Sequence, residues 1–401
     1  MKNKPRIRFK GFTEDWEQRK LNDFGIATGG TSIESEFVDG GDYKVISIGS
    51  YSEESVYNDQ GLRVNKSDKT KSKILNKDDL TMILNDKTAS GNIIGRVLLI
   101  DQDNTYVYNQ RTERIEVDRK NFVPIFLYHM LNAPEQRKYI VKASQGNTQI
   151  YVNWSTVSNI NYMIPKFLLE QEKIAKFFSL INKDITLHQC KLEKLKLAKK
   201  ALLQKLFPKN GSQFPEIRFK GFTDDWEQRK LGEFVKIISG DAPSTFISGS
   251  CIYVKVDDLN YSDRIQLSSS NLVNINPKAH LVNKGAIIFP KRGAAIMTNK
   301  VRIMGKDGYL DTNMMALIPE EIDKDFLFTF IQKTGLYKIA DTSTIPQINN
   351  KHIEPYMIQV PSDKEQEYIG IVFKKLDKII TLHQQEPFLC GNSVNGGGKL
   401  C

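Results

Sequence analysis

The sequence contains no stretch from which a membrane span or an export signal could be built. No run of 18 apolar residues occurs among its 401 positions, and the basic start, Met1 to Arg6, is not followed by an apolar segment. A spanning helix needs about 20 apolar residues, and a signal peptide needs an apolar core behind its basic end. We therefore expect a cytoplasmic protein without a membrane partner.

The sequence also lacks the short motifs by which enzymes bind nucleotides or catalyse hydrolysis. It has no GxxxxGK[ST] loop, no GxGxxG after a strand pattern, no HExxH and no GxSxG. Three histidines, His129, His280 and His352, have no acidic or Cys partner at a useful spacing. We expect a chain that catalyses nothing itself, and an unrecognised enzyme is the alternative.

Cysteine is scarce and scattered. The chain has four, Cys190, Cys251, Cys390 and Cys401, with no CxxC pair and no His at ligand spacing. This pattern favours a reducing compartment and argues against a zinc site, so we expect neither a metal nor another cofactor in this chain.

Positive charge is in excess. The formal net charge is +10, and with 40% hydrophobic residues the chain can bury about two cores. A basic balance is typical of proteins that bind a polyanion, most often nucleic acid. Part of the excess is a solvated helix face, however, because residues 170–205 hold nine Lys against four acidic residues.

The longest pattern in the chain is a helix predicted from Glu170 to Leu206. It contains neither Pro nor Gly, and Pro208 and Gly211 follow it. Apolar residues recur at alternating steps of four and three, which is a heptad seam interrupted by His188 and Lys199. The seam positions are Ile174, Phe178, Ile181, Ile185, His188, Leu192, Leu195, Leu202 and Leu206. Such a helix, roughly 55 Å long, needs a second helix to cover its seam.

Two segments of the sequence are repeated. Residues 365–384 repeat 170–189 at a constant offset of 195, and their matching seam positions are Ile369, Phe373, Leu376, Ile380 and His383. Residues 215–231 repeat 5–21 at an offset of 210, with differences at two positions. The equivalence of His188 and His383 predicts a facing polar pair that sets the register of two antiparallel helices.

Between the repeated segments lie two unlike fillings with the same order of elements. The first predicts strands at 43–48 and 93–100, a strand pair from 106–110 and 114–117, and a helix at 122–131. The second predicts strands at 252–256, 286–289, 301–304 and 311–318 and a helix at 326–335. In residues 1–21 the steps between Phe9, Phe12 and Trp16 resemble a helical turn whose aromatics pack on the long helix. The prediction is an α+β chain: two similar α/β domains separated by long antiparallel coiled-coil helices, with a pseudo-two-fold internal repeat.

The predicted boundaries follow from this repeat. They are a first domain at 1–165, a central helix at 166–207, a linker at 208–214, a second domain at 215–362, a second helix at 363–384 and a tail at 385–401. Pro387 is predicted to end the second helix early, leaving a Gly-rich, disordered tail. Half of the central seam would then lack a cover.

Polar loops occur at matching places in the two fillings. Paired donors and acceptors on Arg, Asn and Gln read base edges, while Lys, Ser and Thr hold phosphates. The candidate DNA-binding residues are Lys87, Thr88, Ser90, Asn92, Arg96, Asn109, Gln110, Arg111, Gln145, Asn147, Thr148, Gln149, Lys291, Arg292, Thr298, Asn299, Lys300, Asn313, Ser343, Thr344 and Gln347.

The repeated frame Phe-Lys-Gly-Phe-Thr-Glu/Asp-Asp-Trp-Glu-Gln-Arg-Lys-Leu and the Glu-Gln-Glu-Lys-Ile helix resemble the specificity subunit of type I restriction-modification enzymes over residues 5–384. The resemblance implies two target recognition domains that each read one half of a split, asymmetric site in double-stranded DNA. It implies two methyltransferase subunits as partners, which methylate adenine with S-adenosylmethionine, and motor-nuclease restriction subunits that use ATP and Mg. The alternatives are a truncated, inactive or scaffold-only subunit and a stand-alone tandem DNA-binding protein.

Overall fold

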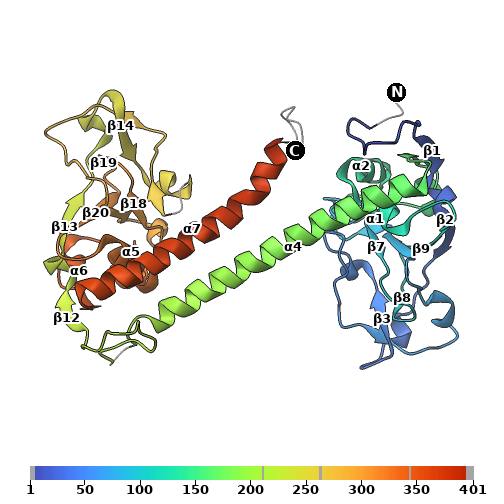
Figure 1. Ribbon diagram of the computed structural model, residues 1–401, viewed down its shortest axis with the longest axis horizontal. Coiled ribbons are helices and arrows are strands. Elements are labelled where there is room, and N and C mark those ends of the chain that lie inside the picture. The colour runs from blue at the N-terminus through green and yellow to red at the C-terminus, as the bar shows by residue number, and fades with distance from the viewer. Residues whose placement is uncertain (1–4, 210–211, 262–263, 343–344, 394–401) are drawn as a thin grey trace. The chain divides into compact units, whose positions relative to one another are not determined.

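The computed structural model describes residues 5–209, 212–261, 264–342 and 345–393 (Figure 1). The chain forms two compact units, residues 1–184 and 185–401. Their boundary falls inside the long helix α4 (Leu168–Lys205), so each unit combines one globular part with a portion of this helix. Among the described residues, no helix is both long and apolar enough to cross a membrane.

The first unit is built on two sheets. A four-stranded sheet has the order β2-β9-β5-β7, and a three-stranded sheet has the order β4-β3-β8. The strands are β2 (Gly25–Gly29), β3 (Tyr43–Ile46), β4 (Arg63–Val64), β5 (Leu80–Ile83), β7 (Val97–Leu99), β8 (Tyr106–Tyr108) and β9 (Thr112–Val117). All four residues of β5 are buried, as expected for a central strand. Helices α1 (Pro124–Asn132) and α2 (Pro134–Ala143) each begin with a Pro at the first turn.

The second unit repeats this plan. A five-stranded sheet has the order β13-β20-β17-β18-β15, and a three-stranded sheet has the order β16-β14-β19. The strands are β13 (Val235–Ser239), β14 (Ser248–Val254), β15 (Ile265–Gln266), β16 (Leu272–Val273), β17 (Ile287–Pro290), β18 (Arg302–Met304), β19 (Gly308–Leu310) and β20 (Met314–Pro319). Helix α5 (Lys324–Thr334) takes the place of α1, and the Asp323 carboxylate caps it by accepting from Phe326 N at 2.8 Å.

The remaining short elements frame these sheets. Two-stranded ribbons join β1 to β11, β6 to β10 and β12 to β21, and α3 and α6 are single turns. Their bounds are β1 (Glu17–Lys20), β6 (Asn85–Asp86), β10 (Ile150–Tyr151), α3 (Trp154–Val157), β11 (Asn161–Ile164), β12 (Glu227–Lys230), α6 (Asn350–Ile353) and β21 (Met357–Val360).

Two expectations from the sequence were wrong. The segments at 106–110 and 114–117 are strands, but they do not pair with each other. β8 runs parallel to β3, and β9 lies between β2 and β5 in the other sheet. Residues 5–16, the described part of the chain before the strand β1, form no helical turn. Their aromatics do contact α4, since the rings of Phe9 and Phe177 are 6.0 Å apart and Lys173 lies over Phe12.

Each repeated N-terminal frame is fastened to its helix by the same buried contacts. Arg8 donates two hydrogen bonds to Glu170, at 2.7 and 2.8 Å, and Arg218 donates two to Glu365, both at 2.8 Å. Both carboxylates are almost fully buried. Fork-to-fork Arg–carboxylate pairs fix orientation as well as distance, so the frame holds the start of each long helix rigidly.

The Gln of each Glu-Gln-Glu motif connects the helix to the globular part. Gln171 Oε1 accepts from Val123 N at 2.9 Å, and Gln366 Oε1 accepts from Asp323 N at 2.9 Å. Val123 and Asp323 directly precede α1 and α5. The repeated Glu-Gln-Glu motif therefore makes the same hydrogen bond between the long helix and the globular part in both units.

Helix α7 (Asp363–Ser393) is longer than expected. It continues past Gln384 and through Pro387, so the predicted end of this helix was wrong, as was the disorder expected for residues 385–393. A proline removes one hydrogen bond and bends a helix without always ending it. The rest of the predicted tail lies outside the described residues.

Candidate nucleic-acid interface

In the first unit, three of the predicted loops meet at the end of β5. Strand β6, which opens the Lys87–Asn92 loop, pairs with β10, which follows the Gln145–Gln149 loop. The turn containing Arg111 joins them, because Leu84 N donates to Arg111 O and Val152 N donates to Leu84 O, both at 2.9 Å. Loops separated by up to about 60 residues in the chain therefore form one polar surface.

The second unit brings its loops together with the same backbone hydrogen bonds. Lys291 N donates to Asn313 O at 2.8 Å, and Ile348 N donates to Lys291 O at 2.9 Å. Arg292 and Gln347 form an isolated bridge beside them. Lys291 thus stands where Leu84 stands in the first unit, and Asn313 where Arg111 stands. The framework is shared while the side chains that it presents differ.

Some side chains of these loops are exposed to solvent, whereas others are buried and hold the loops in place. Exposed ones include Lys87, Thr88, Ser90, Asn92, Gln110, Arg111, Gln145, Asn147, Thr148, Gln149, Arg292, Thr298 and Asn313, while Lys291 and Gln347 are partly buried. Asn109 is only 6% exposed, and its amide is used internally: Oδ1 accepts from Ile33 N and Nδ2 donates to Glu34. Asn109 therefore shapes the loop, and reading by this residue stays a prediction.

Glu34 is the centre of that internal network. It accepts from Ser32, from Asn109 and from Gln110, and these donations lower its pKa to about 2. The carboxylate is therefore charged at neutral pH and holds the Asn109–Gln110 turn in place.

Asp86 and Arg137, which lie outside the predicted set of DNA-binding residues, position the Lys87–Asn92 loop. Burial favours a higher pKa for the Asp86 carboxyl, but donations from Ile93 N and Thr88 outweigh it, and the pKa of Asp86 is lowered. Arg137, on α2, donates to the carbonyls of Gly91, Asn92 and Ile94 at 2.8–3.0 Å. Burial, with Arg96 nearby, lowers the pKa of Arg137 to about 10, so it stays charged at neutral pH. Its role depends on an arrangement that no local motif reveals.

Two of the predicted groups form hydrogen bonds within the fold. Arg96 donates to Asn92 O, in the Lys87–Asn92 loop, and to Ser55 Oγ. In the second unit, Asn299 bonds Gln332 O and Leu336 N at the end of α5, and Lys300 contacts Asn260. Ser343 and Thr344 lie outside the described residues.

A glycine lies at the same place in both frameworks. A Cβ on Gly30 would lie 1.9 Å from Asn109 O, and one on Gly240 would lie 2.0 Å from Asp311 O. Only glycine permits this close approach of two backbones. Gly30 lets the turn before Thr31 pack against the turn that carries Gln110 and Arg111. Gly240 does the same for the turn at Asp311 in the second unit.

One histidine has an acidic partner that its spacing along the sequence does not reveal. His280 does have an acidic partner, because its Nδ1 lies 2.9 Å from Asp241 Oδ1, although 39 residues separate the two in the chain. Tyr253 Oη completes the cluster by donating to Asp241 O and Asp311 Oδ2. No group of three or more His, Cys, Asp or Glu suited to a metal ion occurs within the described residues.

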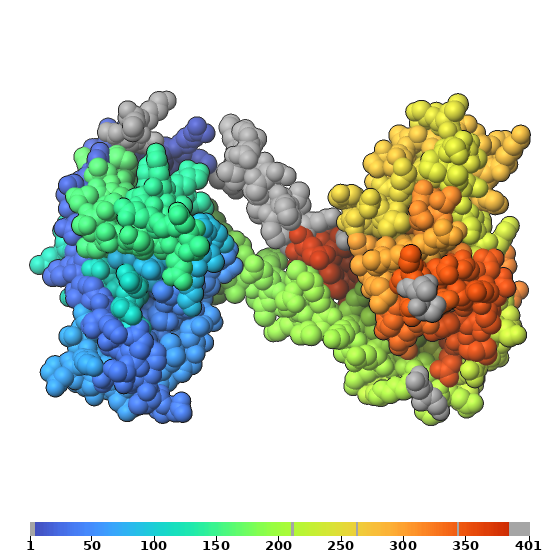
Figure 2. Space-filling view, turned by 180° about the vertical axis from the view of Figure 1, so that it is seen from behind, coloured from blue at the N-terminus to red at the C-terminus, as the bar shows by residue number. Residues whose placement is uncertain are grey.

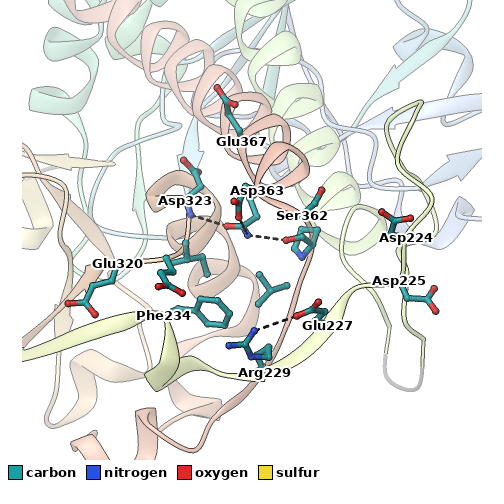
Figure 3. Close-up of a pocket in the computed structure, with 15 residues that line it drawn as sticks. Asp224, Asp225, Glu227, Arg229, Phe234, Glu320, Asp323, Ser362, Asp363 and Glu367 are labelled. Carbon is teal, nitrogen blue, oxygen red and sulfur yellow. Dashed lines mark hydrogen bonds and ion pairs between the residues drawn. The ribbon is translucent and has the colours of Figure 1, made fainter.

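A groove of about 890 Å³ in the second unit is acidic, unlike the basic and amide-rich loop surfaces (Figure 3). It lies between the repeated frame, the segment before α5 and the start of α7. Acidic side chains dominate its wall: Asp224, Asp225, Glu227, Glu320, Glu321, Asp323, Asp363 and Glu367, against Arg229. Carboxylates repel phosphates, so this face is unsuited to nucleic acid, in contrast to the loops around Lys291 and Arg292.

The seam shared by α4 and α7 is most deeply buried where the C-terminal end of α4 meets the start of α7. Leu206, Ile369 and Phe373 are at most 3% exposed, and Leu192, Leu195, Leu202, Leu376 and Ile380 are partly buried. Ile174 is partly buried against the first unit's core. Phe178, Ile181 and Ile185 are 36–46% exposed on α4, the helix drawn in light green in Figure 2. The middle of the helix therefore carries an uncovered apolar stripe.

Both interruptions of the seam are paired within the second unit. His188 and His383 lie against each other, with their Nδ1 atoms 3.4 Å apart. Lys199 Nζ lies 2.6 Å from Asp377 Oδ1 on α7. The later residue on α4, Lys199, meets the earlier residue on α7, Asp377, so the two helices run antiparallel.

Asp377 also connects the helices to the globular part of the second unit. The Arg264 guanidinium bonds Asp377 and, at 2.7 Å, Asp325 on α5, while lying 4.3 Å from the centre of the Phe328 ring. Arg264 is 9% exposed. This cluster fixes α4, α5 and α7 to one another through buried charge.

Comparison with known proteins gives one family. The family model described as the type I restriction modification DNA specificity domain matches residues 13–197 and 223–388. The type I restriction enzyme MjaVIII specificity subunit of Methanocaldococcus jannaschii is 24% identical over 331 residues, covering 78% of this chain and 75% of the relative. The putative MjaX specificity subunit of the same organism is 23% identical over 315 residues, covering 73% and 71%.

Solved structures show the same fold. The S subunit of a type I restriction-modification system from M. genitalium matches with a TM-score of 0.62 and 17% identity, over 95% of this chain and 94% of that one. A chain from a study of complex assembly and conformational transition of the type I R-M system matches with a TM-score of 0.53 and 14% identity, over 98% and 96%.

Proposed function

Because the chain belongs to the family of type I restriction-modification DNA specificity subunits, we propose that it selects the DNA sequence on which a methyltransferase and nuclease complex acts. Each unit reads one half of a split site in double-stranded DNA. The two halves differ in sequence because the two loop surfaces carry different side chains.

The observation that carries this proposal is the shared loop framework. The same pair of backbone hydrogen bonds gathers the loops in both units, through Leu84 in one and Lys291 in the other. The presented side chains are Lys87, Arg111 and the Gln145–Gln149 loop in the first unit, but Arg292, Thr298 and Asn313 in the second. Positively charged and amide side chains on a rigid base are what base and phosphate contacts require.

The chemistry is assigned to partner subunits. We propose two methyltransferase subunits, which transfer a methyl group from S-adenosylmethionine to adenine N6, and restriction subunits that use ATP and Mg for translocation and cleavage. The exposed stripe on α4 offers an apolar surface to such partners. Action on chromosomal DNA would place the complex in the cytoplasm.

Mapping of N6-methyladenine in cells that produce this chain with a type I methyltransferase subunit tests the proposal. We expect a split motif with one modified adenine in each half, on opposite strands. A matched control carries Arg111→Ala, which should weaken or relax only the half read by the first unit. Methylation without this chain, or a continuous motif, would contradict the proposal.

The exposed stripe also supports a second candidate, a truncated subunit that holds partners without delivering them. Phe178, Ile181 and Ile185 are exposed, and the sequence after Gln384 departs from that of the first copy. Replacing residues 385–401 by a segment like 190–206 would then raise thermal stability or abolish self-association and restore methylation. Equal behaviour of the two versions would exclude this candidate.

A further inference from the structure

The contact between His188 and His383 is a long hydrogen bond whose geometry also fits two nitrogens that share a metal ion. The Nδ1 atoms are 3.4 Å apart, and the ring centroids are 5.5 Å apart with planes inclined by 51°. A tetrahedral metal ion with Zn–N distances of about 2.05 Å separates two ligand nitrogens by about 3.3 Å. The two nitrogens therefore stand at a separation that a shared metal ion would allow without moving either helix.

The position of the pair in the repeat supports the same conclusion. His188 and His383 are equivalent residues of the two copies, since 383 − 188 = 195 is the offset of the helix repeat. Equivalent residues touch only where a local two-fold relates the two helices. Such a position offers two identical ligands symmetrically to one ion, and both rings come from rigid helices.

The chemical character of the ligands selects the kind of ion. Imidazole nitrogen suits Zn²⁺, Cu²⁺ and Ni²⁺, whereas Mg²⁺ and Ca²⁺ prefer oxygen. His188 is exposed and His383 partly so, which gives an ion access from solvent. Because the described residues include no group of three or more His, Cys, Asp or Glu suited to a metal, water would complete the coordination.

We propose that His188 and His383 form a two-histidine site for Zn²⁺ that clamps α4 to α7. The site goes beyond DNA recognition. It adds a metal-dependent fastening at the point of the helix pair where His replaces an apolar residue. Because metal binding to the folded chain stabilises it, zinc would strengthen the helix pair.

A zinc titration of the full-length chain tests this proposal. At a hundredfold excess of Zn²⁺ over its dissociation constant, we expect the melting temperature of the second unit to rise by roughly 5–10 °C. His188→Gln and His383→Gln should each weaken zinc binding by more than about tenfold. Removing a residue that only hydrogen-bonds to a metal ligand already costs at least about tenfold in metal affinity. Cu²⁺ bound to the chain should show hyperfine coupling to two nitrogens.

His280→Gln is the matched control, because exposed His280 and partly buried Asp241 form another pair that could attract zinc. We expect this variant to bind zinc at the helix pair as the unmodified chain does. Melting without zinc checks that each variant is folded. A chain that shows no zinc-dependent shift, or a shift that persists in both His188→Gln and His383→Gln, would mean that the two rings form a hydrogen-bonded pair only.

Discussion

The buried charge cluster around Arg264 offers a direct test of how the second unit is held together. Replacing Arg264 by Met keeps an unbranched side chain over the Phe328 ring but removes the guanidinium that bonds Asp325 and Asp377. These carboxylates are 10% and 13% exposed. They would keep only Lys374, at 3.4 Å from Asp325, and Lys199, at 2.6 Å from Asp377.

The size of the effect follows from this remaining pairing. Removing one partner of a buried ion pair costs about 3–5 kcal/mol, mostly because the other charge is left without compensation. Two lysines still serve the carboxylates here, so we expect a loss near the lower end, about 3 kcal/mol. For a unit of this size the loss corresponds to a fall in melting temperature of roughly 6–12 °C.

Calorimetry that resolves the transitions of the two units measures this loss. Arg264→Met should lower only the transition of the second unit, and adding Asp325→Asn should recover part of the loss by removing a carboxylate that needs a partner. Arg229→Met is the control, because Arg229 pairs with Glu233 at the surface and should hardly matter. An Arg264→Met chain as stable as the unmodified one would refute the reasoning.

Three further predictions concern the loop surfaces and the first unit. Lys87→Ala should weaken DNA binding by the complex without changing its sequence preference, and should reduce the slope of log affinity against log salt concentration by about 1. Arg292→Ala should instead alter discrimination between base sequences, and only in the half-site read by the second unit. Binding titrations at several salt concentrations measure both effects. Gly30→Ala should destabilise the first unit by about 1–3 kcal/mol in urea unfolding, because its Cβ would lie 1.9 Å from Asn109 O. The control is Gly29→Ala, whose Cβ would meet nothing nearer than 3.4 Å and which should lower the free energy of unfolding less. Burial raises the pKa of Glu113 to about 7, opposed by Lys73. The folded chain therefore keeps a proton that the unfolded chain releases near pH 4.5, so stability should fall as pH rises from about 4.5 to 7; Glu113→Gln should remove this slope, and an unchanged slope would assign it to other groups.

The features that the sequence predicted well are those that repeat along the chain. The constant offsets predicted the frames, the two long helices and the equivalence of His188 with His383, because similar residues in the same order favour the same local structure. Helices at 122–131 and 326–335 were confirmed as α1 and α5 within a few residues. The matched order of the fillings also indicated two similar domains.

The partners of individual strands and loop side chains could not be predicted. Periodicity identifies β8 and β9 as strands, but their neighbours β3 and β2 lie more than 60 residues earlier in the chain. Arg137 was missed because three loop carbonyls become its partners only after folding. Asn109 was selected as a reader of bases because its amide has suitable chemistry, although the fold uses that amide internally.

The central claim is that each unit reads one half of a split site independently. The most direct measurement is N6-methyladenine mapping with a chain in which residues 232–356 are replaced by the corresponding segment of another family member, produced with the same methyltransferase subunit. We predict that one half of the methylated motif changes while the other half stays as it was. A motif in which both halves change, or neither, would contradict the account.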